Sequence, residues 1–137
     1  MKKFFMTLLF AAFLGVIGFA QTISVKHNVI TNGVKSMQVN IDYHINTSIQ
    51  IYTVLTIYDA NGNVVRGDGE DGYMIYVGSS ILKTFANQNQ TTSHSISYAQ
   101  LGKFLKKNTT YYVSMDIYDY QSNEMLIEGE PVDFYIY

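Results

Sequence analysis

The chain has 137 residues, with nine basic side chains, eleven acidic side chains and no cysteine. The absence of cysteine excludes disulfides, thiolate metal sites and the lipid-modified cysteine of a bacterial lipoprotein. The small acidic excess argues against nucleic acid or an anionic membrane as a partner, because both select a basic protein surface.

The first twenty residues have the layout of a secretory signal peptide. A positive start at Lys2 and Lys3 precedes an uncharged apolar run, which closes with small residues in Gly18-Phe19-Ala20. We therefore expect a signal peptide at 1–20 and a single exported domain at 21–137, in the periplasm or outside the cell. The run is short for a membrane span and no second run follows, so no transmembrane helix is expected after cleavage.

Alternation of apolar and polar residues predicts strands through the first half of the chain. Strands are expected at 22–30, 37–43, 51–59 and 73–77, with turns at Asn32-Gly33 and Asn61-Gly62 and a flexible acidic loop at 67–72.

The second half is expected to begin with an irregular polar segment at 83–90 and a weakly alternating segment at 91–98. Helix-like spacing of Leu101, Phe104 and Leu105 predicts one short helical turn near 98–105. Strands are expected at 110–119, 125–128 and 132–137, with Pro131 between the last two, where a missing N–H is tolerated.

About seven or eight short strands at roughly ten-residue spacing predict an all-β fold. The expected architecture is a two-layer antiparallel β-sandwich, immunoglobulin-like or C2-like, and a small closed barrel is the alternative.

Several turn and strand features also follow a known pattern. They are His27-Asn28-Val29, Asn32-Gly33, the alternation from Lys35 to Tyr43, Tyr58-Asp59-Ala60-Asn61-Gly62, and Ile117-Tyr118-Asp119-Tyr120. The pattern resembles an uncharacterised β-sandwich domain of exported and multidomain proteins in Bacteroidetes-type bacteria. Ser36 and Asn40 depart from it, since the family commonly has Gly and His there. The resemblance implies the fold and the cellular location, and it assigns no functional residues.

Twelve tyrosines and no tryptophan are the unusual feature of the composition. If Ile51, Leu55 and Ile57 face the core, period two puts a set of tyrosines on the outer face. This set comprises Tyr52, Tyr58, Tyr112, Tyr118, Tyr135 and Tyr137. Tyrosine suits recognition of proteins or sugars. The open alternatives are a ladder of cross-strand pairs that stabilises the sheet and a face packed against a covering loop.

Carboxylates suggest a second kind of site, a C2-like calcium site. Asp68 and Asp71 share a glycine-rich loop, and Asp59 and Asp119 end two strands that could bring them to it. Ca²⁺ prefers oxygen ligands that converge from separate loops. The alternative is that Asp59 supports its own turn and the loop stays in water. No other cofactor is expected.

Catalysis has little support in the sequence. The three histidines stand in no nucleophile motif, and neighbouring side chains of Ser93-His94-Ser95 would point to opposite faces of a strand. We expect a non-catalytic module that binds a protein or a glycan through its tyrosine-rich face. A calcium-binding module and a secreted hydrolase remain the alternatives.

Overall fold

The structure is a computed structural model, and it describes residues 20–29 and 35–136. The predicted signal peptide (apart from Ala20), the predicted turn at Asn32-Gly33 and Tyr137 lie outside the described residues. In the part that is described, no helix has the length and apolarity that crossing a bilayer requires.

One layer of the fold is a three-stranded antiparallel sheet. Its strands are β1 (Ala20–Val29), β2 (Lys35–Ile45) and β6 (Gln88–Ser97), in the order β1-β2-β6. The central strand β2 buries Met37, Val39, Ile41 and Tyr43 at alternate positions, as period-two alternation predicts.

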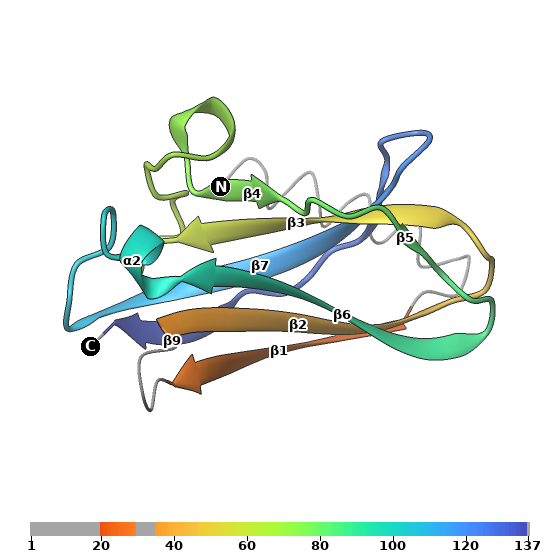
Figure 1. Cartoon of the computed structure of the whole chain (residues 1–137), viewed down its shortest axis with the longest axis horizontal. Coiled ribbons are helices and arrows are strands. Elements are labelled where there is room, and N and C mark those ends of the chain that lie inside the picture. Colours follow the sequence, from red (N-terminus) through yellow and green to blue (C-terminus); the bar gives the residue numbers. More distant parts are fainter. Residues whose placement is uncertain (1–19, 30–34, 137) are drawn as a thin grey trace.

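The other layer is a six-stranded sheet built on the antiparallel pair β3 (Gln50–Tyr58) and β7 (Thr109–Asp119). The order is β4-β3-β7-β8, while β5 also pairs with β3 and β9 also pairs with β7. The shorter strands are β4 (Ile75–Val77), β5 (Leu82–Lys83), β8 (Met125–Ile127) and β9 (Val132–Ile136). Figure 1 shows the two layers, with β1, β2 and β6 facing β3 and β7.

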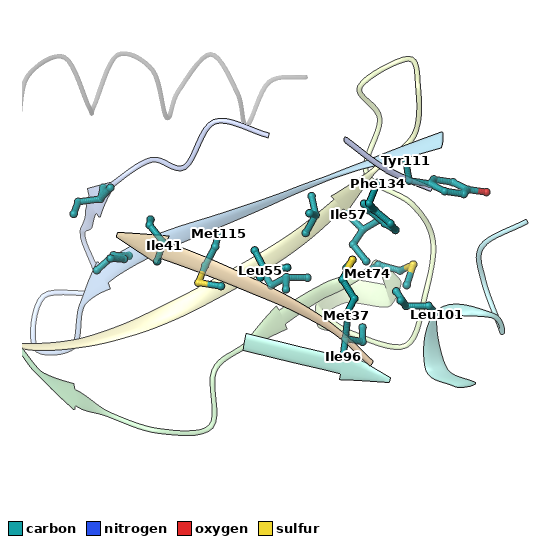
Figure 2. Close-up of a cluster of buried hydrophobic side chains, with 14 of the residues drawn as sticks. Met37, Ile41, Leu55, Ile57, Met74, Ile96, Leu101, Tyr111, Met115 and Phe134 are labelled. Atoms are coloured by element: carbon teal, nitrogen blue, oxygen red, sulfur yellow. The ribbon is translucent and has the colours of Figure 1, made fainter. Parts of the chain in front are cut away.

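The core lies between the two sheets. Figure 2 shows Ile41 and Met37 of β2 pointing toward Leu55 and Ile57 of β3 and Met115 of β7. All five side chains are fully buried. Burial of apolar surface contributes roughly 25 cal/mol per Å², so this cluster is the main source of stability in a chain without disulfides.

Two short helical turns complete the described part of the chain. Helix α2 (Tyr98–Leu101) is capped by Ser97, whose hydroxyl accepts a hydrogen bond from the Gln100 backbone N–H at 3.1 Å. Leu101 and Leu105 are buried, so the turn closes one end of the core. The 3₁₀ turn η2 (Glu70–Gly72) forms part of the loop at 67–72.

The predicted two-layer antiparallel sandwich and the predicted helical turn near 98–105 are confirmed. The described residues form nine strands, rather than the seven or eight expected. The irregular segment expected at 83–90 is limited to 84–87, because β5 includes Lys83 and β6 begins at Gln88. Cross-strand pairing to β2 and β3 orders these polar residues although they carry no apolar alternation.

We predict that Leu55→Ala lowers the free energy of unfolding by about 2–5 kcal/mol, because it leaves a cavity at a fully buried position. Urea denaturation measures this loss. Ile81→Ala is the matched control, since Ile81 is 49% exposed and its truncation should change the free energy by about 0.5 kcal/mol or less. Equal losses in the two variants would contradict the assigned core.

Candidate functional site

The outward-pointing side chains of β3 and β7 form a continuous strip, here called the outer face. Period two places them opposite the core set, and the register pairs them across the two strands. The pairs are Tyr52 with Tyr118, Val54 with Asp116, Thr56 with Ser114 and Tyr58 with Tyr112. The outer face therefore has a tyrosine pair at each end and polar side chains between them.

The first pair is a stacked one. The rings of Tyr52 and Tyr118 lie 5.3 Å apart between centroids, with 14° between their planes. Tyr52 donates a hydrogen bond from its hydroxyl to Oδ1 of Asn123 at 3.2 Å. Burial raises the pKa of both phenols, and Asp116 raises that of Tyr118 further. Both rings are half-buried, so part of this ordered aromatic pair faces the surroundings.

The second pair borders a shallow hollow. Tyr58 is only 5% exposed, whereas its neighbour Tyr112 is half-buried. Together with Pro131 and the turn at 59–62 they line a hollow of about 280 Å³. Tyr135 of β9 lies beside this end of the face, opposite Thr110, and its hydroxyl donates to Oδ1 of Asn108 at 3.4 Å.

Two carboxylates lie between the tyrosine pairs. A register shift in β8 pairs Ile117 with Ile127, and extending this register by one residue places Glu128 opposite Asp116. The Gly129 backbone N–H donates to Oδ1 of Asp116 at 3.0 Å. Burial, followed by the charges of Asp116 and Glu130, raises the pKa of Glu128 to about 7.

Two hydroxyls complete the strip. Thr56 Oγ1 and Ser114 Oγ are buried and have no hydrogen-bond partner in the described part of the chain. They lie close enough to the Tyr58 hydroxyl to lower its pKa, although burial raises that pKa overall.

The predicted tyrosine site is therefore brought together in two groups. Tyr52 and Tyr118 form one end of the outer face, and Tyr58, Tyr112 and Tyr135 lie at the other. Asp116 and Glu128 were not identified from the sequence. The alternation of β7 already put Asp116 outside, but the position of Glu128 depends on the shift in β8, for which no local signal exists.

The predicted calcium ligands do not converge. Asp119 lies beside Ile51 at the start of β3, whereas Asp59 follows Tyr58 at its end. Eight residues of extended chain separate these ends by roughly 26 Å, at ~3.3 Å per residue. Each carboxylate instead supports its own turn. Asp59 Oδ1 accepts from two backbone N–H groups at 2.9 Å each, and Asp119 Oδ1 from two at 2.8 and 3.0 Å.

The acidic loop is fixed by side-chain contacts. Tyr76 donates its hydroxyl to Oδ1 of Asp68 at 2.6 Å, and the Gln100 side chain donates to the same atom at 3.3 Å. These hydrogen bonds, that of Tyr76 foremost, hold the pKa of Asp68 below its usual range. Asp71 is exposed, with φ at 55°. Within residues 35–136 no three potential metal-ligating side chains gather, so the calcium prediction gains no support.

The histidines are spread over the smaller sheet. Nδ1 of His44 lies 3.1 Å from Oδ1 of Asn89. His94 lines a cleft of about 260 Å³ together with several Ser and Thr residues, and no carboxylate is among the described residues that line it. A Ser–His–carboxylate arrangement is therefore not formed at this cleft.

No protein-family model and no curated protein matches the chain. Among solved structures, the chain is similar to Bacteroides uniformis β-glucuronidase 2 covalently bound to cyclophellitol-6-carboxylate aziridine. The TM-score is 0.53 at 9% identity, over 83% of this chain and 13% of that chain. A calcium-binding mutant of the same enzyme gives 0.52 at 10% identity over the same shares. A domain of the outer membrane lipoprotein Omp28 from Porphyromonas gingivalis gives 0.42 at 13% identity, over 88% and 89%.

These similarities establish the fold and nothing finer. The chain spans 13% of the length of the β-glucuronidase, and the ligand and the calcium binding named for that enzyme belong to it.

We predict that Tyr76→Phe raises the pKa of Asp68 toward its ordinary value, because it removes the hydrogen bond that lowers this pKa most. An NMR titration of the Asp68 carboxyl carbon measures the shift. Tyr73→Phe is the control, since the Tyr73 ring contacts Arg66 rather than Asp68. An unchanged Asp68 titration in Tyr76→Phe would contradict the assignment.

We predict that the titration of Glu128 lowers the free energy of unfolding as pH rises from about 5 to about 8. Its folded-state pKa of about 7 exceeds the ordinary value of 4.5, so the folded protein binds more protons than the unfolded chain between these values. Glu128→Gln should abolish this loss of stability between about pH 5 and 8, whereas Glu124→Gln, at an exposed position, should retain it. Urea denaturation at several pH values tests this, and an identical slope in wild type and Glu128→Gln would refute it.

Proposed function

We propose that the protein is an exported, non-catalytic binding module and that the outer face is its binding surface. The observation that supports this most is the stacked pair of Tyr52 and Tyr118, already ordered on a face that points away from the core. Two tyrosines held in place lose little conformational entropy on binding and offer both apolar area and hydroxyls.

The middle of the outer face is less accessible than its ends. Asp116, Glu128, Thr56 and Ser114 are buried, whereas Tyr52, Tyr112 and Tyr118 are half-buried. A protein segment or a glycan would therefore contact the tyrosine rings at the two ends of the face, which offer both apolar area and hydroxyls.

The export part of the proposal is supported by the leader-like pattern of residues 1–20. It places the partner in the cell envelope or outside the cell.

The proposal is tested by affinity capture from a cell-envelope extract, followed by calorimetry with the purified partner. We expect the double variant Tyr52→Ser and Tyr118→Ser to bind at least about tenfold more weakly, as truncated aromatic contacts at interfaces do. Phe85→Ser is the matched control, because Phe85 is an aromatic residue that is 56% exposed and lies in the connection between β5 and β6, outside the outer face.

Circular dichroism and urea denaturation must show that both variants fold before affinities are compared. Recovery of no partner, or equal affinity of the double variant and wild type, would leave the tyrosines as a cross-strand ladder that stabilises the sheet.

A further inference from the structure

A second surface feature lies at the open edge of the sandwich, on the other side of β3 from the outer face. Strand β6 is the edge of the smaller sheet, and β4 and β5 lie at the edge of the larger one. Figure 1 shows the chain between β4 and β5 running along this side of the molecule, beside β6. Residues of β3, β6 and this connection line the cleft of about 260 Å³, here called the edge cleft.

Polar side chains occupy inward-facing positions at the edge cleft. His94 and Thr92 are paired with Val39 and Ile41, which face the core, so they point between the sheets. On the opposite sheet Thr53 stands between the core residues Ile51 and Leu55 and is 4% exposed. Aliphatic side chains at these positions would close the sandwich and stabilise it more, so three facing polar residues indicate a use other than packing.

Gly78 brings the rim of the edge cleft close to β3. Its backbone N–H donates to the Thr53 carbonyl at 2.7 Å, and a Cβ atom at this position would lie 2.6 Å from Thr53 Oγ1. Glycine therefore permits an approach that any side chain would block. Ser79 and Ser80, the two residues that follow Gly78, also line the cleft.

The chemistry of the lining favours an anion. Of the lining residues, Thr53, Thr92 and His94 point between the sheets, and each can donate a hydrogen bond. Among the described lining residues none is acidic, so a cation would find no counter-charge. His94 is the one titratable group of this lining, and burial alone lowers its pKa, without a charge from β3, β6 or the connection between β4 and β5.

We propose that the edge cleft binds a small oxyanion, either a carboxylate or a tetrahedral anion. His94 in its protonated form and the hydroxyls of Thr53 and Thr92 donate to the anion's oxygens. The site is independent of the outer face, because Thr53 and Tyr52 point to opposite sides of β3.

Proton binding and anion binding are linked in this site. The imidazole is neutral at neutral pH, since burial lowers its pKa, and a bound anion favours the charged form. Anion binding therefore raises the pKa of His94, and the affinity increases as pH falls. A rise of one pKa unit corresponds to about a tenfold difference in affinity between the two protonation states.

The test is an NMR titration of the His94 imidazole in the purified protein with acetate and, separately, with sulfate, at constant ionic strength set by chloride. We expect saturable shifts with at least one anion, a raised His94 pKa, and an affinity severalfold higher at about pH 5.5 than at 7.5. Saturation with acetate alone identifies a carboxylate site, and saturation with sulfate identifies a site for tetrahedral anions.

Variants keep the proposal falsifiable. His94→Gln should lose the pH dependence and most of the affinity, whereas the control His44→Gln, outside the edge cleft, should bind as wild type. Should His94→Gln fail to fold, Thr53→Val, which keeps the shape and removes one donor, should weaken binding severalfold. Shifts that do not saturate, or equal affinity in wild type and the folded cleft variants, would overturn the proposal. The outer-face double variant should retain anion binding, so the two proposals fail separately.

Discussion

Eight consecutive cross-strand pairs, from Ile51 with Asp119 to Tyr58 with Tyr112, hold β3 against β7. This register determines both surfaces of the larger sheet at once, because a slip by one residue would exchange them. It sets Leu55 opposite Met115 in the core and stacks Tyr52 on Tyr118 outside. Every feature of the outer face therefore depends on the same pairing that builds the core, and the face has as little freedom to rearrange as the core itself.

Most of the correct predictions from the sequence came from the alternation of apolar and polar residues along the strands. The apolar alternation of β2, β3 and β7 identified the strands, their inner faces and the outward tyrosines. The prediction weakened where alternation is polar. In β6 the inward positions hold Thr92 and His94, so the strand has no apolar stripe and its start at Gln88 was missed. Thr92 and His94, which make this alternation weak, are also the residues that make the edge cleft polar.

The positions of side chains relative to distant strands could not be predicted from the sequence, for a different reason. Asp59 and Asp119 follow the same tripeptide pattern, Ile-Tyr-Asp, but antiparallel pairing sends them to opposite ends of the sheet. Glu128 reaches the outer face because of the register shift in β8; without the shift it would lie opposite Met115, on the core side. Neither result can be obtained from local residue patterns, since both depend on which strands pair and in what register.

The two candidate surfaces share one strand, and this limits how they can interact. Tyr52 and Thr53 are neighbours in the chain, yet one belongs to the outer face and the other to the edge cleft. β3 is hydrogen-bonded to β7 on one side and to β4 and β5 on the other, so its backbone cannot move far without breaking pairs. Coupling between the surfaces would require such a movement. The proposed partner on the outer face and the proposed anion in the edge cleft would therefore bind independently, each to groups that a rigid sheet holds in place.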